Sequence, residues 1–390
     1  MLLRDNDLLR KLWERELPPG KIPKDASGRL LNAYLDLYSE RWSAPEVARA
    51  LARIPGVFTW DDHEIMDGWG SYSDSFQTAP GPQLVWRAAR RAFELVQLGV
   101  LATLRYPPFQ DAELPRGLPA GTAIPAKDGP SILPHFLQAL SFNEPDGELH
   151  VVILDLRTER SDQRVMAEEG QWEHLEAWLK GLEAHVRKGA RLSRKRHLVI
   201  VSSIPLVFLS GAFPEWILKK FVPGGQEYED DLRDQWESPA HSDERERLVG
   251  RLFAAAKACN CRVTVLSGDV HVGSKAELVS KQKEHSRGNG DSETITQLVA
   301  SGMVHPAPGW LAALFEEFAQ GVQGGERVGH KMRGRLLPFS ERGFVFERNF
   351  LEIRPDDLDS QNPNTLRGRL HARWVVEGGA LQDDRVTLEP

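Results

Sequence analysis

The hydrophobic and polar positions along the chain follow two periods, one typical of helices and one typical of buried strands. Apolar residues recur at helical spacing in the segments Asn6–Glu16, Leu30–Trp42, Ala44–Ile54, Gln83–Leu104, Glu168–Arg187, Ala212–Val222, Ser242–Cys259 and Trp310–Ala319. Short apolar runs predict strands at Leu149–Leu156, His197–Val207, Val263–Leu266, Lys275–Lys281, Thr294–Ser301, Gly343–Ile353 and Leu370–Val376. Helices alternate with strands at first and strands prevail later, so the pattern predicts an α/β or α+β fold.

One predicted strand is followed at once by two side chains that can bind a metal ion. The segment Arg262–Gly273 reads RVTVLSGDVHVG, and its apolar run stops just before Asp269 and His271. Residues two apart in an extended segment point to the same side. A carboxylate and an imidazole together suit a hard or borderline divalent ion. The alternative is a capped strand end at which both side chains are only hydrated or hydrogen-bonded.

A second segment shows the same order of apolar and then polar residues. Ile54–Glu64 reads IPGVFTWDDHE, in which a short apolar run predicts a strand and the acids and histidine of residues 61–64 follow. Such groups are seldom buried unpaired, so they are unusual for a core segment. The alternative is a helix N-cap whose acids favour the helix dipole. Because ligands of α/β sheets bind at strand ends, both segments predict one shared site, with His63 within about 12 Å of His271.

The two segments together resemble the PhoD-like alkaline phosphatases, a branch of the calcineurin-like metallophosphoesterases. WDDHE precedes LSGDVH in that family's order, and further pieces occur in the same order at Leu37–Trp42, Leu154–Arg160, Val199–Leu206, Asp231–Trp236 and around Asn349. The resemblance implies a metallophosphatase-like sandwich of two sheets flanked by helices. It also implies opening motifs, Asp-x-His and Gly-Asp-Gln, that have no match before Trp60. We therefore expect one PhoD-like domain over residues 1–390, with its N-terminal strands missing and a helical and loop insertion at about 70–145.

The resemblance also implies a set of metal ligands. Asp62, Asp269 and His271 are the expected ligands, and Ser202-Ser203 stands where many relatives have a metal-binding histidine. Calcium and iron are the metal ions that the resemblance implies, with manganese or zinc as alternatives. Two metals about 3.5–4 Å apart would neutralise the phosphoryl oxygens and activate a water.

Further roles follow from the same resemblance. His63 is the expected proton donor, and Asp61 and Glu64 are expected to orient it and the ligands. Arg157, after a predicted strand, is a candidate for bidentate phosphate binding, with a surface ion pair as the alternative. The predicted function is metal-dependent hydrolysis of a small phosphate ester. The alternative is a catalytically impaired remnant that serves as an interaction domain.

Composition and charge argue against nucleic acid as a partner and against a membrane span. The chain has 390 residues and a net charge of −7, which gives no basic footprint for nucleic acid. No apolar run reaches the ~20 residues of a membrane span, and the charged N-terminus is not typical of a signal peptide. Cys259 and Cys261 are expected to be buried thiols at a helix-to-strand junction. These features together predict a cytoplasmic protein, with an exported form as the alternative if an N-terminal segment has been lost. No pattern specifies the oligomeric state.

Overall fold

The computed structural model describes residues 6–99, 135–144, 147–188, 195–208, 236, 238–268, 270–280, 294–300, 302–303, 326–328, 332–337, 344–355, 370–379 and 385–388. Three sequence predictions lie outside these residues: the helices at 212–222 and 310–319 and the placement of Asp269. Residues 100–134 of the predicted insertion also lie outside them.

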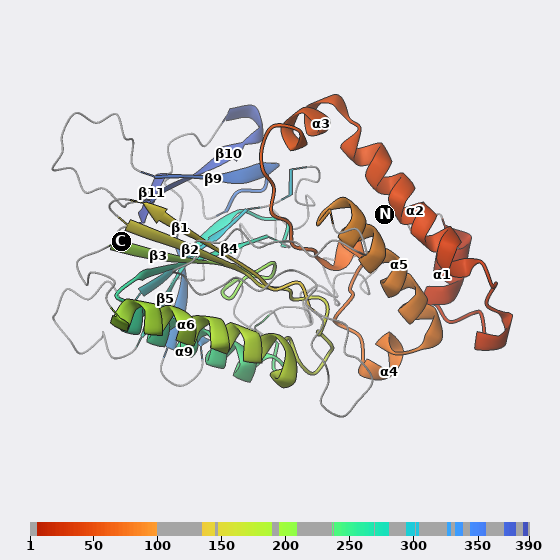
Figure 1. Ribbon diagram of the computed structural model, residues 1–390, viewed down its shortest axis with the longest axis horizontal. Helices are drawn as coiled ribbons and strands as arrows, with labels where there is room; N and C mark the ends of the chain where they lie inside the picture. Colours follow the sequence, from red (N-terminus) through yellow and green to blue (C-terminus); the bar gives the residue numbers. More distant parts are fainter. Residues whose placement is uncertain are drawn as a thin grey trace.

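The described strands form a large mixed sheet and a small antiparallel one (Figure 1). The large sheet has the strand order β1-β2-β3-β4-β6-β5-β8-β7. Its members are β1 (Gln138–Glu144), β2 (Gly147–Ile153), β3 (Lys195–Val201), β4 (Arg262–Ser267), β5 (Ser274–Ser280), β6 (Thr294–Val299), β7 (Glu326–Val328) and β8 (Met332–Leu337). Strands β2, β3, β4 and β6 are parallel, and the other pairs are antiparallel. The parallel strands are the ones whose ends carry the predicted site.

The small sheet covers one face of the large sheet. It contains β9 (Asn349–Pro355), β10 (Leu370–Val376) and β11 (Arg385–Leu388), in the order β11-β10-β9. Its apolar side chains pack with Val199 of β3 and Leu298 of β6 in one buried cluster. Trp374 of β10 also donates a hydrogen bond from Nε1 to the Val299 carbonyl at 2.8 Å. This arrangement confirms the predicted two-sheet sandwich.

Two helices cover the opposite face of the large sheet (Figure 1). These are α6 (Glu173–Lys188), which follows a single π turn at Glu168–Trp172, and α9 (Ser242–Cys259). Leu198 and Ile200 of β3 are fully buried beneath them, whereas Val199 points to the small sheet. Because successive side chains of a strand point to opposite faces, a strand buried on both faces reads as a continuous apolar run.

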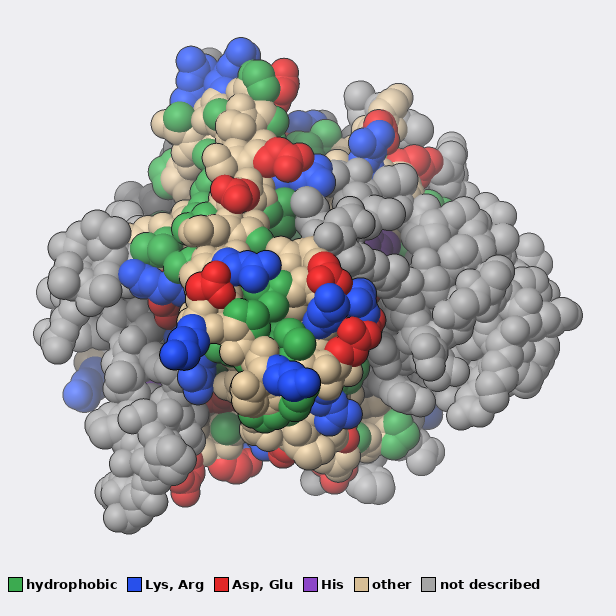
Figure 2. Space-filling view, turned by 90° about the vertical axis from the view of Figure 1, so that its right-hand side faces the viewer, with side chains coloured by type: hydrophobic (Ala, Val, Ile, Leu, Met, Phe, Trp, Pro, Cys, Tyr) green, Lys and Arg blue, Asp and Glu red, His purple; other side chains and the backbone are tan. Residues whose placement is uncertain are grey.

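The described residues before β1 form helices and no strand. They comprise α1 (Asp7–Trp13), the 3-10 turn Pro19–Lys21, α2 (Ala26–Trp42), α3 (Pro45–Leu51), α4 (Asp74–Gln77) and α5 (Pro80–Val96). Their shared core is aromatic, and Trp60 packs at ring-centroid distances of 5.2 Å from Phe93 and 5.0 Å from Phe136. Since Phe136 leads into β1, this contact connects the helical part to the large sheet. Figure 2 shows acidic and basic side chains interspersed on the outer face of this part.

Several strand predictions need correction. Residues 55–61 form no strand, although Val57, Phe58 and Trp60 suggested one. Strand β2 ends at Ile153, so Asp155 and Leu156 belong to the turn that follows it. The sequence analysis missed β1, β7, β8 and β11, none of which contains three consecutive apolar residues.

The prediction for the cysteines is confirmed, because both are buried where α9 gives way to β4. No helix in the described part of the chain is long and apolar enough to cross a membrane.

A buried histidine pair leads us to expect that the stability of this fold depends on pH. His135 Nε2 lies 2.7 Å from His174 Nδ1, and burial lowers the pKa of His135 to about 4. An unfolded histidine has a pKa of about 6.5, so the unfolded chain binds more protons between these two values. We expect the contribution of His135 to the free energy of unfolding to fall as pH decreases from about 6.5 to 4, at up to about 1.4 kcal/mol per pH unit. The buried carboxyls of Glu64 and Glu159, whose pKa values are raised to about 7, contribute in the opposite direction.

Urea unfolding at several pH values measures this dependence. His135→Gln should remove this contribution, so the variant should lose less stability than the wild type as pH decreases from about 6.5 to 4. His371→Gln, on β10 away from this pair, should keep the pH dependence of the wild type. A pH dependence that survives His135→Gln unchanged would show that other groups cause it.

Candidate functional site

The WDDHE segment is positioned by hydrogen bonds to the ends of β1 and β2. Gln138 Nε2 donates to the Phe58 carbonyl at 2.7 Å, and Thr59 Oγ1 donates to the Leu154 carbonyl at 3.1 Å. The Trp60 indole Nε1 donates to Asp155 Oδ1 at 2.8 Å. These contacts replace a strand ladder and bring the acids of residues 61–64 to the C-terminal end of β2.

The acids and histidine then form a single 3-10 turn, Asp62–Glu64. Glu64 Oε2 accepts a hydrogen bond from the Asp61 backbone N–H at 2.8 Å, which is the reciprocal half of a capping box. Burial raises the pKa of the Glu64 carboxyl to about 7. Glu64 therefore caps the turn, as the N-cap alternative proposed for this segment. This capping role leaves the neighbouring Asp62 and His63 available for a site.

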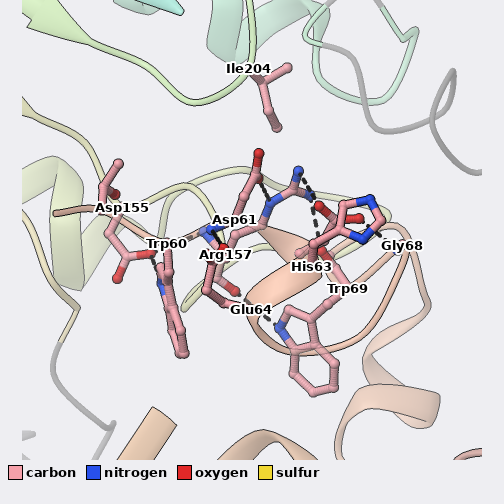
Figure 3. Close-up of polar contacts among 12 residues, drawn as sticks. Trp60, Asp61, His63, Glu64, Gly68, Trp69, Asp155, Arg157 and Ile204 are labelled. Carbon is pink, nitrogen blue, oxygen red and sulfur yellow. Dashed lines mark hydrogen bonds and ion pairs between the residues drawn. The ribbon is translucent and has the colours of Figure 1, made fainter. Parts of the chain in front are cut away.

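The guanidinium of Arg157 lies beside Asp61 (Figure 3) and also pairs with Asp62. Its side chain is fully buried. The guanidinium donates from Nε to Asp61 Oδ1 and from Nη1 to the Trp69 carbonyl at 3.0 Å, and its Nη2 lies 3.4 Å from Asp62 Oδ1. A buried cation requires such partners, so the geometry favours a positioning role for Arg157. Phosphate binding by Arg157 stays a prediction.

Three side chains of this segment converge in a way that suits a metal ion. Asp62, 3% exposed, accepts at Oδ2 from the Gly68 backbone N–H at 2.8 Å. His63 is exposed, and its Nε2 lies 3.9 Å from Asp67 Oδ1. Asp62, His63 and Asp67 each offer one ligand atom, and these atoms lie within 4.8 Å of one another.

His271 approaches the same place from the loop after β4. Its ring centroid is 6.3 Å from that of His63, so the predicted convergence of these two histidines is observed. The loop is not extended, however: His271 has a φ of +55°, and the Val270 N–H donates to the Gly268 carbonyl at 2.9 Å. The backbone is therefore not extended at His271, and the expectation that Asp269 and His271 share one side stays a prediction. Asp269 itself lies outside the described residues.

The chemistry of these donors fits one divalent ion. Carboxylate oxygens and imidazole nitrogens suit manganese, zinc, iron or, with more oxygen ligands, calcium. Each carboxylate oxygen has two lone pairs, so the Asp62 oxygens can accept a hydrogen bond and still face a cation. Asp62, His63 and Asp67 offer three ligand atoms, and His271 stands beside them. In the part of the chain that the structure describes, this is the one such group of three.

The sequence analysis did not select two residues that matter to this arrangement. Asp67 follows His63 by four positions, but only the turn brings the two side chains together. Asp155 belongs to the segment Leu154–Arg160, which resembles the family, yet the sequence analysis predicts no role for it.

Ser203 stands at the position where the sequence analysis expects a histidine ligand in relatives. Its side chain is 9% exposed just after β3, and its carbonyl accepts a hydrogen bond from the Gly268 N–H at 3.0 Å.

Comparisons with known proteins place the chain in a family. Residues 9–324 match the PhoD-like phosphatase family. The chain is 28% identical over 314 residues to the uncharacterized protein YGR266W of Saccharomyces cerevisiae (strain ATCC 204508 / S288c). That alignment covers 69% of this chain but 42% of the yeast protein, so the chain spans less than half of the length of this relative. No solved structure matches the chain significantly. Because the family match extends over well more than half of the residues, the chain belongs to the PhoD-like phosphatase family.

Proposed function

We propose that the protein is a metal-dependent phosphoester hydrolase whose metal site lies at the WDDHE turn. The observation that carries the proposal is the convergence of Asp62, His63 and Asp67, with His271 beside them. Membership of the PhoD-like phosphatase family supports the reaction class. The substrate is then a small phosphate ester.

Asp62 and Asp67 are the proposed carboxylate ligands, and Asp269 and His271 are proposed to complete the site from the β4 loop. When bound, the metal would supply positive charge for the phosphoryl oxygens and activate the attacking water. Calcium and iron remain the first candidates, with manganese and zinc next. Two ions need more ligands than the described residues provide, so a second ion would depend on Asp269 and its neighbours.

His63 is the proposed proton donor to the leaving group. Its side chain is 57% exposed, so a substrate can reach it, and its Nε2 lies 3.9 Å from Asp67 Oδ1. The same imidazole also lies within reach of the metal, so ligation is the competing role. If His63 is a metal ligand, its removal should weaken metal binding. If it is only the proton donor, metal binding should be unchanged.

Asp61, Glu64 and Arg157 are proposed to hold the site in shape. Arg157 binds both aspartates, and Glu64 caps the turn through the Asp61 N–H. The positive charge of the guanidinium also offsets the mutual repulsion of the Asp61 and Asp62 carboxylates.

Replacement of Asp62 by asparagine tests the metal site. Asp62→Asn should lower the affinity for manganese or zinc by more than the roughly 10–100-fold that a supporting residue contributes. Isothermal titration of the metal-free protein measures this affinity. Asp61→Asn is the matched control, because Asp61 shares the contact with Arg157 but lies outside the group of three. Equal losses for the two variants would contradict the assignment of Asp62 as a ligand.

Replacement of His63 by alanine separates proton donation from metal binding. His63→Ala should lower the turnover of an aryl phosphate about 10²–10⁴-fold while the metal content stays unchanged. His271→Ala, in contrast, should reduce metal affinity. Loss of the metal from His63→Ala would identify His63 as a ligand. Metal binding without any turnover by the wild-type protein would favour the alternative of an interaction domain.

A further inference from the structure

Asp155 is a buried carboxylate that joins three separate segments. It is fully buried at the C-terminal end of β2. Its Oδ1 accepts hydrogen bonds from Trp60 Nε1 at 2.8 Å and from the backbone N–H groups of Arg157 and Thr158, each at 3.0 Å. Its Oδ2 accepts from the Phe136 N–H at 2.7 Å and from Thr158 Oγ1. The carboxylate thus ties the WDDHE segment, the residues leading into β1 and the turn after β2 to one point.

Two routes lead from Asp155 to the candidate metal site. The first runs through Trp60, which directly precedes Asp61 in the chain. The second runs through Arg157, whose backbone N–H binds Asp155 and whose guanidinium binds Asp61 and Asp62. Trp69 strengthens the second route, because its Nε1 donates to the Arg157 carbonyl at 3.1 Å and its own carbonyl accepts from Arg157 Nη1. Main chain and side chain of Arg157 are therefore both fixed.

We propose that Asp155 is a positioning residue for the metal site, acting through Trp60 and Arg157 to hold Asp62 in line with His63 and Asp67. This inference rests on the proposed function. Asp155 touches neither His63 nor Asp67 in the described contacts, so it controls where the ligands stand and is not a ligand. Groups that support ligands in this way contribute about 10–100-fold to metal affinity.

Glu159 provides a matched comparison within the same turn. It is also buried, and its carboxylate accepts from the Ala167 N–H at 2.7 Å and from the Gln171 N–H. These bonds lead towards α6 and away from WDDHE. Replacement of a residue that only stabilises the turn should change the melting temperature alone, as we expect for Glu159. Replacement of a positioning residue should also change the affinity for the metal.

The test measures metal affinity and thermal stability side by side. Asp155→Asn should lower the affinity for manganese about 10–100-fold and alter the visible spectrum of the cobalt-substituted protein, which reports the ligand geometry. Glu159→Gln should change the melting temperature and leave the affinity and the cobalt spectrum as in the wild type. Equal manganese affinity and an unchanged cobalt spectrum in Asp155→Asn would overturn the inference.

Two milder variants serve if Asp155→Asn does not fold. Each removes one hydrogen bond to Asp155: Trp60→Phe on the WDDHE side and Thr158→Val on the opposite side. We expect weaker manganese binding for Trp60→Phe and not for Thr158→Val, and equal behaviour of the two would overturn the inference. Wild-type protein that binds none of manganese, zinc, iron and calcium would overturn the proposed function and this inference together. Failure of the variants alone overturns only the inference.

Discussion

The buried guanidinium of Arg157 is the interaction on which the site depends. A charge in a fully buried position is tolerated only when carboxylates and hydrogen-bond acceptors surround it. Here these partners are Asp61, Asp62 and the Trp69 carbonyl, all from the segment that carries the candidate ligands. The turn after β2 and the WDDHE turn must therefore stand together, and displacement of either leaves a buried charge without compensation.

Further hydrogen bonds explain how an irregular segment can hold the candidate site in place. Residues 55–61 have no strand ladder, yet side chains of Gln138, Thr59 and Trp60 fix them to the sheet. The aromatic core of the helical part closes over Trp60 from the other side. The candidate site residues then lie on a loop supported by a packed scaffold, an arrangement typical of catalytic and binding sites.

The candidate metal ligands and the family membership point to the same class of chemistry. Three ligand atoms at WDDHE and a nearby histidine suit one ion, and family membership supports a phosphoesterase. The chain spans less than half of the length of its yeast relative. Arg157 pairs with both Asp61 and Asp62, so its positive charge offsets the repulsion between these two neighbouring carboxylates.

The sequence by itself determined the parts of the protein that depend on local periodicity. Helix α9 and strand β10 have the predicted bounds, and His63 and His271 were singled out because polar residues follow apolar runs. Only the tertiary structure decided the contacts between distant residues, such as Asp61 with Arg157, which are 96 positions apart. It also decided the roles of Asp67 and Asp155, because a turn and a buried hydrogen-bond network have no period along the chain. Hydrophobic patterning specifies which face of an element is buried, whereas the partners of a buried charge are set by how the elements pack.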